Sequence, residues 1–321
     1  MSDSAEGPGN ESAAKHASPE CSWGNHSGPV LAERHGGTVI ACRSCGYRHT
    51  VPLPDPERVR RFYAEEFYGG FHKDYIGGQQ RDLSWWQLEF AAKYSLFEEL
   101  LLPPRRRLLD VGSGPGWFLQ FGRGRGWTTV GVEPSAAACA HARGELGCEV
   151  VQGFFEPAAV ADLAPVDVVH LNNVLEHVPD PGALLDTARA VLAPAGLICL
   201  TSPNDFNPLQ AALVALRGHE PWWVDPREHV NYFDRPSLDG LLRRHDFVPV
   251  RWLASFPLEL FALMGEDYLA DPALGSVIHG KRKALEHALH EVGRADLLVE
   301  LYGKLGEMGL GRTVTVVGAR K

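Results

Sequence analysis

An acid and three alternating glycines form the segment of this chain whose spacing points most directly to chemistry. The segment reads Leu108-Leu-Asp110-Val-Gly112-Ser113-Gly114-Pro-Gly116 and continues into an amphipathic stretch. An apolar run that ends in glycines before such a stretch predicts a buried strand, a tight turn and the start of a helix. Glycine lets the backbone turn sharply and lets a ligand lie against the main chain, because no Cβ stands in the way. The segment therefore predicts a cofactor site.

A second acid, Glu133, closes the next apolar run, Thr128 to Val132, about one strand–helix unit after the glycines. A carboxylate at this place accepts hydrogen bonds from the hydroxyls of a ribose. The rival interpretation is a nicotinamide or flavin dinucleotide, whose sites prefer the spacing Gly-x-Gly-x-x-Gly. Here the spacing is Gly-x-Gly-x-Gly, so a different ribose-bearing cofactor is favoured.

Cysteines near the N-terminus have the spacing of a zinc site. Cys42-x-x-Cys45 is followed by a glycine, and two cysteines on a tight turn suit tetrahedral thiolate ligation. The segment resembles a small zinc ribbon with two Cys-x-x-Cys pairs, but Ser-Trp-Gly follows Cys21, so the second ligand of its first pair is missing. His26 can take the missing place, which gives Cys21, His26, Cys42 and Cys45 as candidate ligands of one structural zinc ion. The alternative is that this chain has lost the metal.

The whole-chain composition excludes several kinds of partner. The chain has 321 residues and a net charge of −9, which argues against nucleic acid, because binding phosphates needs a basic face. No stretch approaches the roughly 20 apolar residues of a membrane span, and the polar N-terminus lacks a signal-peptide core. Six cysteines in a chain of this size do not suggest a disulfide framework. We therefore expect a cytoplasmic protein that binds neither nucleic acid nor a membrane.

Alternating strands and helices must position the glycines and acids. The expected strands are 107–111, 128–132, 149–152, 166–171, 196–201, 247–253 and 312–318. The expected helices between them are 116–125, 135–146, 157–162, 181–193 and 236–245. This alternation predicts an α/β fold, in which a doubly wound, mostly parallel seven-stranded sheet carries helices on both faces.

The remaining segments are expected to surround that sheet. Residues 1–20 have the composition of a disordered tail, and 21–55 form a small Cys-containing, ribbon-like segment. Residues 56–102 are helical in pattern and form an N-terminal cover. The cofactor-binding domain is then 103–321, with a helical insertion at 256–309. The insertion could be a lid or the contact of a homodimer.

Four segments together resemble the class I S-adenosylmethionine-dependent methyltransferases. They are 110–116, 131–135, 152–156 and 167–181, in the right order and at the right intervals. The resemblance covers about residues 90–255. It implies a Rossmann-like methyltransferase fold in which the 103–321 domain binds S-adenosylmethionine.

The resemblance also implies which residues touch the cofactor. They are Asp110, Gly112, Ser113, Gly114, Gly116, Glu133, Pro134, Gln152, Gly153, Phe154, Phe155, Asn172 and Asn173. Asp110 would face the amino group of the methionine part, and Glu133 both ribose hydroxyls. Phe154 and Phe155 would flank the adenine, although adjacent residues leaving a strand point in opposite directions, so we expect contact from only one of them. An N-terminal cover over the cofactor would include Tyr75, Trp85 and Trp86.

The resemblance also makes two histidines candidates for a general base. His177 follows the fourth strand, where the active-site rim of the family runs, and His229 lies in a loop after the fifth strand that faces the acceptor in similar enzymes. Neutral imidazole is well suited to take a proton from a hydroxyl. The nearby Trp222, Trp223 and Tyr232 would form an aromatic wall for the acceptor, or would simply pack the loop.

The sequence thus predicts a methyltransferase that acts on a small molecule, for which we favour a hydroxyl of a sugar or secondary metabolite. Methylation at carbon or nitrogen is the alternative within the class. A non-catalytic scaffold that binds S-adenosylmethionine is the alternative outside it.

Overall fold

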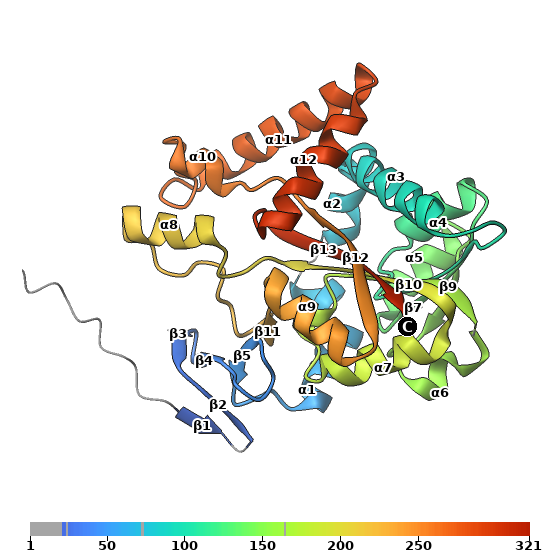
Figure 1. Ribbon diagram of the computed structural model, residues 1–321, viewed down its shortest axis with the longest axis horizontal. Coiled ribbons are helices and arrows are strands. Elements are labelled where there is room, and N and C mark those ends of the chain that lie inside the picture. The colour runs from blue at the N-terminus through green and yellow to red at the C-terminus, as the bar shows by residue number, and fades with distance from the viewer. Residues whose placement is uncertain (1–20, 24, 72–73, 164) are drawn as a thin grey trace, which may run out of the picture.

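A seven-stranded sheet forms the centre of the structure (Figure 1). The structure is a computed structural model that describes residues 21–23, 25–71, 74–163 and 165–321, so the predicted tail 1–20 lies outside the described residues. The strands of the sheet are β6 (Arg107–Val111), β7 (Thr128–Glu133), β8 (Glu149–Gln152), β9 (Val166–Asn172), β10 (Leu192–Pro203), β12 (Phe247–Ala254) and β13 (Thr313–Arg320). All seven predicted strands are present, with bounds that differ from the expected ones by a few residues.

The strand order across this sheet is β12-β13-β10-β9-β6-β7-β8. The five strands β6 to β10 pair in parallel, whereas β13 runs antiparallel to both of its neighbours. The predicted doubly wound, mostly parallel sheet is confirmed. The chain order reverses between the adjacent strands β6 and β9, and ligands of open α/β sheets bind outside the carboxyl ends of the strands at such a point.

Helices pack on both faces, because the strands are apolar on both sides. One buried cluster joins α3, α4 and α5 to one face through residues such as Phe97, Phe118 and Cys139. The other joins α7 and α9 to the opposite face through residues such as Leu185 and Leu238. The helical elements of this layer are α3 (Leu83–Leu100), α4 (Trp117–Gly124), α5 (Ala136–Gly144), α6 (Pro157–Val160), η2 (Ala161–Leu163), η3 (Leu175–His177), α7 (Pro181–Val191), α8 (Pro208–Arg217) and α9 (Arg235–Arg244).

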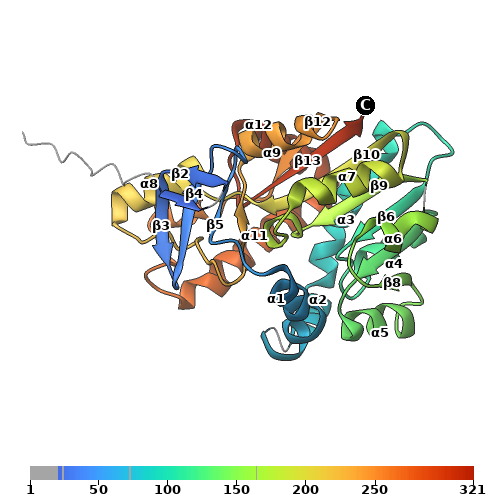
Figure 2. The ribbon, with the colours of Figure 1, turned by 90° about the horizontal axis from the view of Figure 1, so that it is seen from below.

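A small sheet lies beside the main one, at the opposite end of the molecule from β8 and α5 (Figure 2). It contains β3 (Val30–Arg34), β4 (Gly37–Ala41) and β5 (Arg48–Val51), preceded by a hairpin of β1 (Cys21–Trp23) and β2 (His26–Gly28). Its fourth strand, β11 (Asn231–Tyr232), comes from the loop after α8 and pairs with β5. The sequence did not predict this long-range pairing.

Further helices flank the carboxyl ends of the strands and the far side of α3. The N-terminal ones are α1 (Pro56–Arg61), the π-helix η1 (Phe62–Phe71) and α2 (Tyr75–Arg81). Between β12 and β13 the chain forms α10 (Glu259–Leu263), α11 (Ala273–Glu291) and α12 (Ala295–Met308). Of these, α11 packs against α3, and α12 packs against α11 and β12 (Figure 1). Within the part of the chain that the structure describes, no helix combines the length and apolar character needed to cross a membrane.

Candidate active site

A cavity of about 490 Å³ opens at the carboxyl ends of β6, β7 and β9, at the reversal of strand order. This volume lies within the usual range for small-molecule sites. The predicted cofactor-binding residues that line it are Asp110, Gly112, Ser113, Gly114, Glu133, Pro134, Gly153, Phe154, Phe155, Asn172 and Asn173. The structure therefore gathers segments that lie far apart in the sequence around one space.

The glycine turn has the backbone shape that its sequence predicts. Gly112, Gly114 and Gly116 have φ values of 66°, 53° and 92°, a region that side-chain-bearing residues rarely adopt. A Cβ on Gly114 would stand 3.1 Å from the hydroxyl of Tyr68 across the cavity. Gly116 is not among the lining residues. It caps α4, and a Cβ there would lie 2.8 Å from that of Ala142.

Glu133 is held rigidly at the end of β7. Its side chain is almost fully buried, and its two oxygens accept from the backbone N–H groups of Gly114 and Ser135, each at 2.9 Å. Burial raises the pKa of this carboxyl to about 7, against the lowering effect of those two hydrogen bonds. Each oxygen keeps a further lone pair, so the carboxylate can accept two more hydrogen bonds from a ligand.

A chain of buried polar groups connects Asp110 to the cover helix α3. His170, opposite Asp110 in the β6–β9 register, bonds Asp110 through Nδ1 at 2.7 Å. Its Nε2 lies 3.4 Å from the ammonium of Lys93, which also donates to the Asn172 side-chain oxygen at 2.8 Å. Since an ammonium can only donate, Nε2 must accept and Nδ1 must carry the proton given to Asp110. The chain thus fixes the orientation of both Asp110 and Asn172.

Lys93 keeps its charge in this buried place. Burial disfavours the ammonium, but its negative neighbours, foremost the Glu89 carboxylate 2.8 Å away and also Asp110, together raise the pKa of Lys93 above its usual value. Sequence reasoning missed Lys93, Glu89 and His170. The available signal for Lys93 was a lone cation on the apolar stretch Phe90–Phe97. His170 required the strand register, which the sequence alone does not supply.

Aromatic side chains close the cavity from the N-terminal side. Phe67 and Tyr68 of η1 and Tyr75 of α2 contact one another with ring centroids 5.1 to 5.6 Å apart, and Trp86 of α3 lines the same wall. Trp85, the third residue expected in the cover, is instead buried against α11. The aromatic pattern of residues 62–68 was visible in the sequence, but its direction toward the cavity was not.

The two adjacent phenylalanines differ in their surroundings. The guanidinium of Arg60 lies 4.2 Å from the ring centroid of Phe154. Phe155 packs against the core cluster on the α7 side, although it also reaches the cavity. Gln152, at the end of β8, is not among the lining residues.

His177 reaches the cavity from η3, directly after β9. Its Nδ1 lies 2.9 Å from the Glu228 carbonyl oxygen, which can only accept, so Nδ1 carries the proton and Nε2 has the free lone pair. Burial, reinforced by the neighbouring His229, lowers the pKa of His177 to about 3. The ring is therefore neutral, as a proton acceptor must be.

His229 and Glu176 lie behind His177 and not in the cavity wall. The rings of His177 and His229 are 5.2 Å apart, and burial lowers the pKa of His229 to about 4. Glu176 Oε1 is 3.8 Å from His177 Nε2, and burial raises the pKa of this carboxyl to about 8. The three side chains offer ligand atoms within 4.8 Å of one another, so they could also hold a cation.

The aromatic residues expected to face the acceptor lie elsewhere. The lining residues of the cavity do not include Trp222, Trp223 or Tyr232. Tyr232 is fully buried against the small sheet as part of β11. Arg34 draws the preceding loop to the same sheet through hydrogen bonds to the carbonyl groups of residues 221, 222 and 224.

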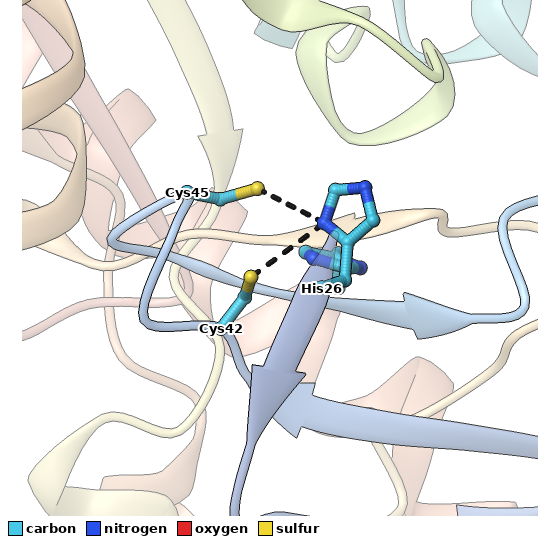
Figure 3. Close-up of side chains that lie close together, drawn as sticks. His26, Cys42 and Cys45 are labelled. Atoms are coloured by element: carbon cyan, nitrogen blue, oxygen red, sulfur yellow. Dashed lines mark hydrogen bonds between the residues drawn. The ribbon is translucent and has the colours of Figure 1, made fainter. Parts of the chain in front are cut away.

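The N-terminal cysteines lie outside this cavity, in and beside the small sheet. Cys42 and Cys45 both point toward Nδ1 of His26, as Figure 3 shows. The backbone of Cys21 pairs with Gly28, but its side chain lies outside the described residues. The sequence missed His49, which joins the other three.

Comparisons with known proteins agree with this architecture. A family model described as "Methyltransferase domain" matches residues 83–251, more than half of the chain. The ubiquinone biosynthesis O-methyltransferase of Paramagnetospirillum magneticum is 30% identical over 214 residues, which cover 64% of this chain and 86% of the relative. The trans-aconitate 2-methyltransferase of Variovorax paradoxus is 32% identical over 134 residues, covering 40% and 50%. The ubiquinone biosynthesis O-methyltransferase of Caulobacter sp. is 36% identical over 134 residues, which cover 38% of this chain and 51% of the relative. The chain thus spans about half the length, or less, of the first relatives that it matches.

Solved structures extend the likeness of the fold. The plantazolicin methyltransferase BamL, in complex with a triazolic desmethylPZN analog and SAH, has a TM-score of 0.51 at 16% identity and covers 83% of this chain and 99% of its own. The plantazolicin methyltransferase BpumL in complex with SAH has the same TM-score at 12% identity and covers 82% and 94%. At these identities the likeness concerns the fold alone. On its sequence match, its sheet order and the site at the strand reversal, the chain belongs to the class I S-adenosylmethionine-dependent methyltransferases.

Proposed function

We propose that this enzyme methylates a hydroxyl group of a small molecule, with His177 as the general base. The observation that carries the proposal is a single cavity in which the glycine turn, Glu133 and the neutral ring of His177 all take part. S-adenosylmethionine supplies a methyl group that its sulfonium has already activated. The protein must therefore bind the two reactants in line, exclude water and take up one proton.

The residues around the glycine turn suit this cofactor. We assign Glu133 to the ribose hydroxyls, because its two free lone pairs face a cavity bounded by the main chain of Gly112 and Gly114. Asp110 is assigned to the ammonium of the methionine part. Ser113 supports a polar ligand here, since its hydroxyl is buried without a hydrogen-bond partner among the described residues.

The methionine carboxylate needs donors rather than acceptors. Asn172 offers them, because Lys93 occupies the oxygen of its side-chain amide and leaves the NH₂ group for a ligand. We assign Asn172 to this carboxylate. Asn173, whose φ is 54°, forms the turn that follows β9. Phe154 is the better candidate for contact with adenine, because Phe155 also packs into the core. The remaining expected contacts, Pro134 and Gly153, line the same end of the cavity.

His177 is a better base than His229 on this geometry. It lines the cavity with a free Nε2 lone pair, whereas His229 lies behind it. Tyr63 lines the same part of the cavity and packs against His177, with ring centroids 5.2 Å apart, so the aromatic ring shields the base from water.

The acceptor class follows from the relatives and from charge. Two relatives are named O-methyltransferases, which favours a hydroxyl over a carbon or nitrogen atom. The net charge of −9 disfavours nucleic acid, so a sugar or secondary metabolite remains our proposal. We place the enzyme in the cytoplasm, since none of the five cysteines whose side chains are described forms a disulfide. Exposed Val277, Val292 and Val299 on the insertion favour a homodimer.

The test combines a labelled methyl donor with a panel of hydroxylated small molecules, and mass and NMR spectra locate the new methyl group. We expect an O-methyl product, turnover lost in His177→Ala and turnover largely kept in His229→Ala. A methyl group on carbon or nitrogen would refute O-methylation and support the alternative, methylation at carbon or nitrogen. Full turnover in His177→Ala would remove the histidine base.

A further inference from the structure

We propose that His26, Cys42, Cys45 and His49 bind one structural zinc ion, which fixes the small sheet against the catalytic domain. The four residues come from β2, from the turn after β4 and from β5. Their ligand atoms all lie within 4.8 Å of one another, although the residues span positions 26 to 49. This set replaces Cys21, the first ligand expected from the sequence, with His49.

The distances match tetrahedral zinc. With Zn–S near 2.3 Å and Zn–N near 2.0–2.1 Å, a tetrahedral site places a sulfur and a nitrogen ligand about 3.6 Å apart. The Nδ1 atom of His26 lies 3.6 Å from Cys42 Sγ and 3.4 Å from Cys45 Sγ (Figure 3). Both thiols therefore approach the same nitrogen at the separation that a shared ion requires.

His49 carries the most specific sign of a missing ligand. Its side chain is 1% exposed, and its Nδ1 donates to the Thr50 carbonyl oxygen at 2.8 Å. That bond fixes the tautomer and leaves the lone pair on Nε2, which is buried and has no partner among the described residues. A buried acceptor without a partner is costly, whereas zinc-bound histidines commonly use their second nitrogen for such a carbonyl bond.

The local backbone suits a metal knuckle. The Gly46 N–H donates to the Cys42 carbonyl at 3.0 Å, and Gly46 has φ of 73°, so the chain turns tightly between the two cysteines. The hydrophobic cluster here has only Ile40, Cys42 and Val51 as buried members. Such a core is small, so a closed four-ligand site would supply much of the folding free energy of this segment.

The site also reaches the catalytic domain. His49 pairs with Asn231 of β11, and the Thr50 N–H donates to the Val230 carbonyl at 2.8 Å, one residue after His229. On the other side, Arg244 of α9 donates to the Cys45 carbonyl at 2.7 Å. Zinc would therefore stabilise the loop that supports His177, without contacting the cavity itself.

The experiment measures metal content by mass spectrometry in the full chain, purified without a polyhistidine tag. We expect roughly one zinc ion per chain. We expect loss of zinc in His49→Ala, and retention in Cys21→Ser and in the control His287→Ala on α11. Chelation of the wild type should lower its unfolding temperature. A wild type without zinc, a His49→Ala variant with full zinc, or a Cys21→Ser variant without it would each overturn the proposal.

Cobalt(II) substitution keeps the proposal testable if His49→Ala does not fold. His49→Cys retains four ligands and increases the thiolates from two to three, so the thiolate-to-cobalt absorption should rise about 1.5-fold. An unchanged spectrum would show that position 49 does not bind the metal. Neither metal content nor cobalt absorption measures methyl transfer. A failed zinc proposal would therefore leave the proposed methylation reaction unaffected.

Discussion

Replacing Glu133 by glutamine should stabilise the protein without ligand and weaken its binding of the cofactor. The carboxyl is 4% exposed, and its pKa rises from an ordinary 4.5 to about 7 because burial penalises the charge. That difference corresponds to about 3 kcal/mol, since each pH unit is worth about 1.4 kcal/mol. The neutral amide of Glu133→Gln removes this penalty. Its oxygen can accept from one of the two backbone N–H groups, and loss of the other hydrogen bond offsets about 1 kcal/mol of the gain.

The gain should depend on pH in a defined direction. Because the pKa is raised in the folded protein, the wild type loses stability as the pH rises from about 4.5 through about 7. Glu133→Gln has no such loss, so the difference between the two proteins should grow over that range and level off above pH 8. At pH 8 the variant should unfold roughly 3 °C higher, measured by scanning calorimetry without ligand.

Cofactor affinity should change in the opposite sense. Loss of the charge-assisted acceptor for the ribose hydroxyls should cost about 3 kcal/mol, or roughly a 100-fold rise in Kd by titration calorimetry. The exposed Glu145 at the end of α5 provides the control, because Glu145→Gln should change neither quantity. A Glu133→Gln variant that unfolds earlier at pH 8 would refute the burial argument. An unchanged Kd would refute the ribose assignment.

Three other perturbations address the glycine turn, the buried cation and the base. Gly114→Ala should raise the Kd for the cofactor at least tenfold, because φ of 53° disfavours alanine and the new methyl group would enter the cavity. The control Gly124→Ala, which has open space around its Cβ, should leave this Kd unchanged in the same titration. Lys93→Met should lower the free energy of unfolding in urea by about 2 kcal/mol, since it removes a buried ion pair from one side, whereas Lys304→Met on the surface of α12 should have little effect. At saturating cofactor, the rate of methyl transfer should stay constant from pH 7.5 to 5.5, because the lowered pKa keeps His177 neutral. A roughly tenfold fall in this rate over that range would indicate a histidine with an ordinary pKa, or another base.

The sheet and its cofactor turn were predictable because they depend on local signals. Apolar runs bounded by glycines locate β6 and β7, and the acids at positions 110 and 133 follow from their places at strand ends. Parallel strands buried on both faces give continuous apolar runs, which distinguish them from the surrounding helices.

The contacts that the sequence could not supply are long-range. The pairing of β11 with β5 joins chain segments about 180 residues apart and carries the aromatic loop away from the cavity. The zinc ligand His49 is separated from Cys45 by three residues, but its burial and free nitrogen depend on how β5 packs against β11. Similarly, the link between Lys93 and Asp110 requires both the strand register and the docking of α3.

Two adjacent tryptophans on α3 have separate neighbours. Trp86 faces the ligand space, whereas Trp85, whose ring lies 4.6 Å away, donates its indole N–H to Glu286, which is 201 residues further along the chain. The helix α3, which forms one wall of the catalytic chamber, is thus supported on its outer side by α11, between the last two strands of the chain. A ligand that binds those helices more tightly when the chamber is filled would, by reciprocal linkage, strengthen binding in the chamber from a surface that no reactant touches.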